Sequence, residues 1–245
     1  TPPDPDKTDG LEPIYWTALK QSHQQQKNNN KLPTAGLRHG HTFLKLIDLI
    51  GYQDLIFNMF DDSANLKKLI NIIQNFNLAL VERFIKAETE MIKYPEDLGM
   101  QKGPMLSPAH FRKFIKPVYK KIMSPAKKAN RLVHFHSDGD IKTLLPDILD
   151  CGIDAINLQD LVNGIDWIKQ NLTGKVCVDL DIDRQNVTHF GSPADINNLI
   201  KQEVKKLGSK QGGLMLIFGL YPGTPIKNAI AVADAMQKYS TYFCD

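Results

Sequence analysis

The sequence predicts an α/β fold in which parallel strands alternate with helices, and two observations support this prediction. Short apolar runs alternate with longer segments of helical period along most of the chain, which is typical of strand–helix units in a parallel sheet. Polar and charged side chains follow nearly every apolar run. Because parallel sheets bind ligands at the carboxyl ends of their strands, these side chains indicate chemistry there.

Six strand–helix units are recognisable, and they allow two architectures. One is an open, doubly wound sheet, and the other is a (β/α)8 TIM barrel that lacks its first two strand–helix units in this chain. A doubly wound sheet binds its ligand mainly at one switch point, whereas a barrel gathers all its strand ends into one ring. Carboxylates after many strands therefore favour the barrel.

The order of the elements follows from local signals. Residues 1–31 form a polar N-terminal segment, in which 1–10 are loose and the amide-rich tract 20–31 is a surface loop, and residues 32–245 form a single barrel domain. Serine caps open the helices at Ser63, Ser107 and Ser192. The expected strands are 32–40, 90–94, 132–136, 155–158, 176–180 and 214–218, and the expected helices are 42–50, 63–84, 107–122, 141–149, 192–207 and 226–239.

Composition limits the classes of function. The 245 residues carry 30 basic and 27 acidic side chains without a polybasic block, so nothing indicates nucleic-acid binding. No apolar run approaches the roughly 20 residues that cross a bilayer. Three cysteines lie far apart, which favours a reducing, cytoplasmic location over a disulfide framework. The absence of an initial methionine indicates a processed or excised piece of a longer protein.

The segment Arg131 to Asp140, RLVHFHSDGD, gives the strongest functional signal. Its apolar run ends in His136 and Asp138, which we interpret as a pair of metal ligands at a strand end. His134 lies two residues earlier and shares a face with His136 in a strand. In the alternative interpretation, Asp138 caps the next helix and His136 binds a backbone carbonyl.

Further candidates follow other strands. Glu96 and Asp97 are candidate catalytic acids or bases, with helix capping as the alternative. Asp179, Asp181 and Asp183 alternate along a strand, and we select Asp181 as catalytic, with Arg184 as the partner of Asp183.

Four more side chains complete the predicted site. Tyr221, a further catalytic candidate, lies in a turn rich in proline and glycine, where it could bind a ligand or pack under the last helix. Arg38 and His39 are candidates for binding an anionic group, and Gln159 for binding polar groups of the substrate.

The order of several motifs resembles that of the uroporphyrinogen decarboxylase superfamily, which also contains the cobamide-dependent methyltransferases. The motifs are EDLG at 96–99, GPMLSP at 103–108, HSDGDI at 136–141, GIDAINLQD at 152–160, DID at 181–183 and GLYPGTPIKN at 219–228. The resemblance covers most of the chain from about Leu32 onward and implies the (β/α)8 barrel.

Two departures from the decarboxylases bear on function. Their porphyrinogen-binding arginine loop and aspartate belong to the first two units, which this chain lacks. They also place a histidine just before GLYP, whereas this chain has Phe218, which we place among the substrate-binding residues.

The methyltransferases use a zinc site of the form His-x-Cys with a distant second cysteine. Here the corresponding residues are His136 and Asp138, and Phe218 lies near the position of the second cysteine. Replacing thiolate by carboxylate hardens a site that still suits zinc. Glu96, Asp97, Asp181 or His134 would have to complete it.

The resemblance therefore implies an enzyme on the methyltransferase side of the superfamily. We expect methyl transfer to a small-molecule acceptor at a zinc site, from a corrinoid that a partner protein supplies, and a homodimer is compatible with the sequence. The alternatives are uroporphyrinogen decarboxylation and a truncated, non-catalytic binding domain.

Overall fold

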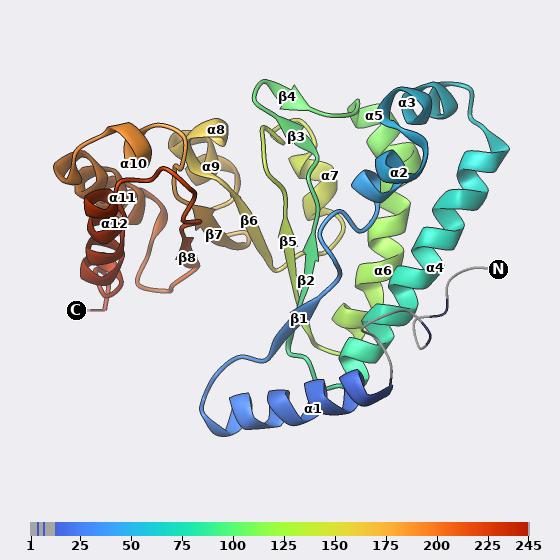
Figure 1. Ribbon diagram of the computed structural model, residues 1–245, viewed down its shortest axis with the longest axis horizontal. Helices are drawn as coiled ribbons and strands as arrows, with labels where there is room; N and C mark the ends of the chain where they lie inside the picture. Colours follow the sequence, from blue (N-terminus) through green and yellow to red (C-terminus); the bar gives the residue numbers. More distant parts are fainter. Residues whose placement is uncertain (1–3, 5–6, 8–12, 245) are drawn as a thin grey trace. The chain divides into compact units, whose positions relative to one another are not determined.

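The computed structural model describes residues 4, 7 and 13–244. The chain divides into two compact units, unit 1 (Thr1–Asp154) and unit 2 (Ala155–Asp245), and each is described by itself. Each unit contributes three parallel strands with helices between them (Figure 1). The predicted α/β class with parallel strands is confirmed. The expectation of a loose segment at residues 1–10 lies outside the described residues, apart from Asp4 and Lys7.

Three parallel strands in the order β1-β2-β5 form the sheet of unit 1. β2 and β5 are aligned so that Tyr94 lies opposite Phe135 and Pro95 opposite His136. Tyr94 and Phe135 are fully buried, since helices cover the strands of a parallel sheet. The strands are β1 (Thr34–Gly36), β2 (Met91–Pro95) and β5 (Leu132–His136), and a small antiparallel hairpin, β3 (Gly99–Met100) and β4 (Gly103–Pro104), follows β2.

Two helices of unit 1 begin directly after the predicted serine caps. The hydroxyls of Ser63 and Ser107 accept hydrogen bonds from the backbone N–H groups of Leu66 and His110. α4 packs on α6, which a π-helical turn at Phe111–Ile115 precedes. The helices are α1 (Pro13–Asn28), α2 (Phe43–Ile50), α3 (Tyr52–Phe60), α4 (Ala64–Lys86), α5 (Pro108–His110), α6 (Lys116–Lys128) and α7 (Leu145–Leu149).

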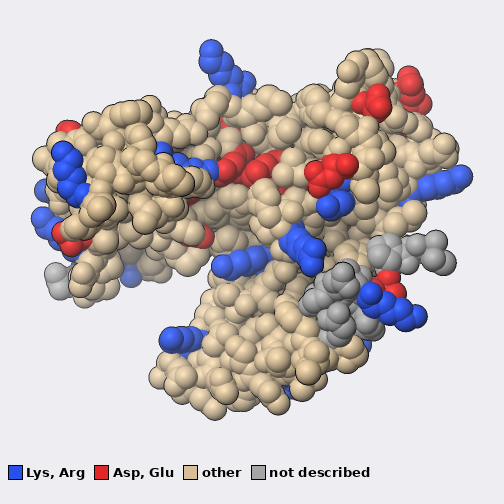
Figure 2. Space-filling view, in the orientation of Figure 1, with Lys and Arg blue, Asp and Glu red and all other residues tan. Residues whose placement is uncertain are grey.

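The prediction that residues 20–31 form a loop was wrong, because α1 continues through them to Asn28. Glutamine and lysine are good helix formers. One side chain anchors the helix: His23 is fully buried, and its Nδ1 lies 2.8 Å from the carbonyl oxygen of Ala87. The helix does lie at the surface, and Figure 2 shows mostly uncharged side chains over it.

Unit 2 has the strand order β6-β7-β8, again parallel. The hydroxyl of Ser192 and the carboxylate of Asp195 form a capping box at the start of α11, as the Ser-Pro signal predicts. α11 and α12 enclose a core around Ile182, Ile196 and Val232. The elements are β6 (Ala155–Gln159), α8 (Asp160–Asn163), α9 (Ile165–Asn171), β7 (Cys177–Asp181), α10 (Val187–Phe190), α11 (Pro193–Leu207), β8 (Leu214–Ile217) and α12 (Ile226–Tyr239).

Two expected elements are shorter in the structure. The strand predicted at 32–40 is β1, with only three residues, and the helix predicted at 141–149 is regular only in α7. After β1 the chain stays joined to β2 by single backbone bonds, from Leu37 to Lys93 and from Gly40 to Pro95. Before α7 the backbone N–H groups of Leu144 and Leu145 both donate to the carbonyl of Ile141, which is the bonding of a turn. Within the described residues, the structure contains no helix with the length and apolar character that crossing a membrane requires.

Candidate functional site

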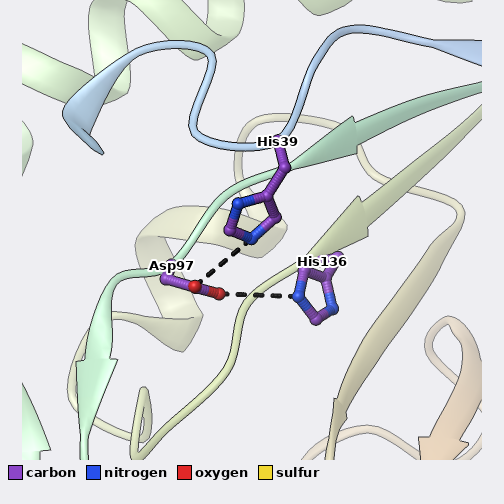
Figure 3. A group of neighbouring side chains, drawn as sticks. All are labelled: His39, Asp97 and His136. Atoms are coloured by element: carbon purple, nitrogen blue, oxygen red, sulfur yellow. Dashed lines mark ion pairs between the residues drawn. The ribbon is translucent and has the colours of Figure 1, made fainter. Parts of the chain in front are cut away.

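The carboxyl ends of β1, β2 and β5 bring together three side chains that are far apart in the sequence. His39 follows β1, Asp97 follows β2, and His136 is the last residue of β5. Because the three strands are parallel and adjacent, their ends lie at the same edge of the sheet. Figure 3 shows the carboxylate of Asp97 facing both imidazole rings, with one dashed line to each ring.

Each oxygen of Asp97 faces a different histidine. Asp97 Oδ2 lies 3.2 Å from His39 Nε2, and Asp97 Oδ1 lies 3.5 Å from His136 Nε2. One ligand atom from each of the three residues lies within 4.8 Å of the others. The side chains of Asp97 and His136 are 26% and 20% exposed, and that of His39 is 53% exposed. The cluster is therefore held by the protein and still open to a small ligand.

The surroundings of Asp97 favour its ionised form. Burial alone would raise the pKa of this carboxyl group. The hydrogen bond from His136, the backbone N–H of Asp138 and the charge of His39 outweigh burial, so the pKa of Asp97 is lowered. Asp97 is thus a carboxylate at neutral pH, which is the form that binds a cation.

Asp138 lies at the margin of the same cluster. Its Oδ1 is 3.9 Å from His136 Nε2, and its backbone N–H donates to Asp97 Oδ1 at 3.0 Å. The sequence suggested His136 and Asp138 as the metal pair, whereas the geometry groups His136 most closely with His39 and Asp97. Asp138 contributes a backbone donor and a nearby carboxylate.

The three clustered residues have the donor atoms of a divalent metal site. Zinc bonds of 2.0 to 2.2 Å at tetrahedral angles separate neighbouring ligand atoms by about 3.4 Å. One ligand atom from each of the three residues lies within 4.8 Å of the others, so a modest approach of the side chains would bring them to that spacing. Two imidazoles and one carboxylate would leave a fourth position for a substrate, as catalytic zinc sites do. The residues therefore fit a zinc-like cation.

Glu96, predicted as catalytic, points to the interior instead. Its carboxylate is fully buried and accepts hydrogen bonds from the backbone N–H groups of Thr42, Phe43 and Leu44 at the start of α2. The hydroxyl of Tyr119 also donates to it, at 3.1 Å. Burial raises the pKa of Glu96 to about 7, although these four hydrogen bonds oppose the rise. The geometry is that of the helix cap, the alternative left open by the sequence.

In unit 2 a second polar group forms around Asp181. Arg184 Nη1 lies 2.9 Å from Asp181 Oδ2 and donates to the hydroxyl of Tyr221 at 2.9 Å. The guanidinium also lies over the Tyr221 ring, 5.0 Å from its centroid. The sequence paired Arg184 with Asp183, and this was wrong. Asp183 accepts backbone N–H groups at the start of α10, including those of Asn186 and Val187, so its charge is already compensated.

The remaining predicted residues have diverse surroundings. Gln159 is buried at the end of β6, and its carbonyl oxygen accepts a hydrogen bond from Asn163. Phe218 is partly buried against the apolar core of unit 2. Arg38 is exposed beside His39. His134 is buried in the middle of β5. Thus these four residues are not part of the three-residue cluster around Asp97.

Two more buried groups shape these sites, and the sequence did not single out the first of them, Ser137. Ser137 is fully buried, and its hydroxyl accepts a hydrogen bond from Leu98 at 2.9 Å. Asp160 is almost fully buried and accepts the backbone N–H of Asp183 at 2.8 Å. The position of Ser137 beside His136, directly at a strand end, was the available signal.

Comparison with known proteins identifies the family. The family model described as uroporphyrinogen decarboxylase (URO-D) matches residues 15–239. The chain belongs to the uroporphyrinogen decarboxylase family. A methyltransferase from Methanosarcina mazei has a similar fold, with a TM-score of 0.69 and 18% identity over 95% of this chain and 67% of that one. The family and this match support the assignment to the (β/α)8 barrel type.

Curated relatives carry the name uroporphyrinogen decarboxylase. The one from Geotalea daltonii is 24% identical over 73% of this chain and 54% of its own length. The chloroplastic one from Nicotiana tabacum is 28% identical over 61% of this chain and 40% of its own length. The chain thus spans about half the length of these uroporphyrinogen decarboxylase relatives or less.

Proposed function

We propose that this member of the uroporphyrinogen decarboxylase family activates a small acceptor at the cluster of His39, Asp97 and His136 for methyl transfer. The methyl group would come from a corrinoid that a partner protein carries. The observation that carries the proposal is the ionised Asp97 carboxylate with one imidazole on each oxygen. A zinc-like cation held there would act as a Lewis acid and lower the pKa of the acceptor.

Each residue of the cluster has a separate role in this proposal. Asp97 orients both imidazole rings, and His136 is fixed at the end of a strand, which favours a defined geometry. His39 is the most exposed of the three, so it lies nearest to solvent. The carboxylate of Asp138, 3.9 Å from His136 Nε2, would accept the proton that the acceptor loses.

The negative charge of the cluster favours this proposal over decarboxylation of a porphyrinogen, the reaction after which the curated relatives are named. Asp97 and Asp138 both lie within 4 Å of His136. A substrate with several carboxylates would meet like charges at this site, which disfavours its binding.

Metal binding and turnover test the proposal together. Zinc content and Co²⁺ affinity are measured in the purified chain, in His136→Ala and in His110→Ala, a control that removes a histidine of α5 in the same unit. Methylcobalamin serves as the methyl donor, with a panel of thiols and alcohols as acceptors. We expect metal binding and methyl transfer in the parent and the control, and loss of both in His136→Ala.

Two results would overturn the proposal. One is the absence of metal binding in the parent chain. The other is decarboxylation of uroporphyrinogen that His136→Ala leaves unchanged, which would establish the rival activity. If neither reaction occurs although metal binds, the non-catalytic binding domain is the better interpretation.

A further inference from the structure

Backbone hydrogen bonds join the loop that follows β2 to the loop that follows β5. The backbone N–H of Gly99 donates to the carbonyl of Asp138 at 3.2 Å, and that of Asp140 donates to the carbonyl of Met100 at 2.7 Å. The backbone N–H of Glu96 donates to His136 at 3.0 Å. These bonds continue the pairing of β2 with β5 beyond the regular strands.

Ser137 supplies a side-chain bond within this series. Its hydroxyl accepts from the backbone N–H of Leu98 at 2.9 Å and donates to the carbonyl of Asp138 at 3.0 Å. A hydroxyl group can accept one hydrogen bond and donate another, whereas the methyl side chain of alanine can do neither. Ser137 and Leu98 are both fully buried, so water cannot replace the bond.

Two glycines let the loops approach closely. A Cβ atom on Gly139 would lie 2.2 Å from the carbonyl carbon of Gly99, and a Cβ atom on Gly99 would lie 2.5 Å from that of Gly139. Gly139 also has φ of +79°, which side-chain-bearing residues rarely adopt. A side chain at either position would therefore force the two loops apart.

Asp97 lies between residues that these hydrogen bonds hold in place. The residue before it is bonded to His136, the residue after it is bonded to Ser137, and its own carboxylate receives the backbone N–H of Asp138. We infer that Ser137 is a positioning residue: through Leu98 and Asp138 it fixes the Asp97 carboxylate between the two imidazoles before any ligand binds. The inference concerns the same cluster on which the proposed function rests.

Replacement of Ser137 tests this inference. In Ser137→Ala we expect a crystal structure without metal to show the Asp97 carboxylate displaced from His136. We also expect Co²⁺ affinity to fall by about 10- to 100-fold, the usual effect of losing a group that orients a ligand. Ser137→Thr keeps the hydroxyl and should restore the affinity. Ser107→Ala, which removes the cap of α5, is the matched control and should change neither quantity.

Further outcomes separate the inference from the proposed function. An unchanged Asp97 position together with unchanged Co²⁺ affinity in Ser137→Ala would overturn the inference. If the parent chain binds no Co²⁺, the proposed function fails, and the position of Asp97 in the variant still decides the inference. Should Ser137→Ala not fold, Ser137→Cys, which nearly keeps the side-chain volume but accepts hydrogen bonds only weakly, takes its place in both measurements.

Discussion

Glu96 and Asp97 are adjacent in the sequence, yet their carboxylates have opposite surroundings. Glu96 is fully buried among the backbone N–H groups at the start of α2, whereas Asp97 reaches His39 and His136 at the open edge of the sheet. Successive side chains of an extended segment point to opposite sides. Glu96 therefore caps α2, and Asp97 connects the two histidines of the cluster.

Removing the buried carboxylate should destabilise the chain. In Glu96→Ala, three N–H groups of α2 and the hydroxyl of Tyr119 lose their acceptor. Leaving buried donors unpaired costs about 1 to 3 kcal/mol each in isolated cases, and partial relaxation makes about 3 kcal/mol a reasonable total. Urea unfolding measures the loss. Glu82→Ala, at an exposed position of α4, should stay within about 0.5 kcal/mol of the parent chain.

The pKa of Glu96 predicts a pH dependence of stability. Because the folded chain raises this pKa from 4.5 to about 7, the folded state binds the proton more tightly than the unfolded state. The resulting stabilisation is complete below about pH 4.5 and is lost as the pH rises through about 7, on the order of 3 kcal/mol in total. In Glu96→Gln the difference from the parent chain should change with pH in this window. A constant difference would contradict the assignment.

The contacts of Arg184 in unit 2 should contribute to stability as a network. Arg184→Gln removes the guanidinium from the buried Asp181 and from Tyr221. Loss of the partner of a buried carboxylate costs about 3 kcal/mol. The double variant with Asp181→Asn should recover part of this loss, because no charge is then buried. A double-mutant cycle from urea unfolding gives the coupling energy, and strict additivity would show that the pair does not interact.

The capping box of α11 gives a local prediction. Ser192→Ala removes the acceptor for the backbone N–H of Asp195 and should cost about 1 kcal/mol. Asp195→Asn should cost less, since an amide oxygen can still accept from the N–H of Ser192. Thermal unfolding of both variants checks the order. A larger loss in Asp195→Asn would show that charge at the helix start dominates.

Much of the fold was predictable because its signals are local. The helix predicted at 226–239 is α12 with the same bounds, and the strand predicted at 132–136 is β5. The caps at Ser63 and Ser192 also lie where the sequence placed them. By contrast, the part of α1 at residues 20–28 was missed, and its buried contact, that of His23 with Ala87, joins residues 64 positions apart.

The sequence by itself determined the strand–helix alternation and the polar residues that end each strand, because periodicity and capping depend on residues that are close together in the sequence. It named His39 for substrate binding, His136 as a metal ligand, and Asp97 as a catalytic residue or one of four that could complete the metal site. Only the tertiary structure decided that these three side chains meet, that Glu96 turns inward and that Arg184 binds Asp181. The partner of a charged side chain depends on which strand ends become neighbours, and that choice is made by the packing of the whole sheet.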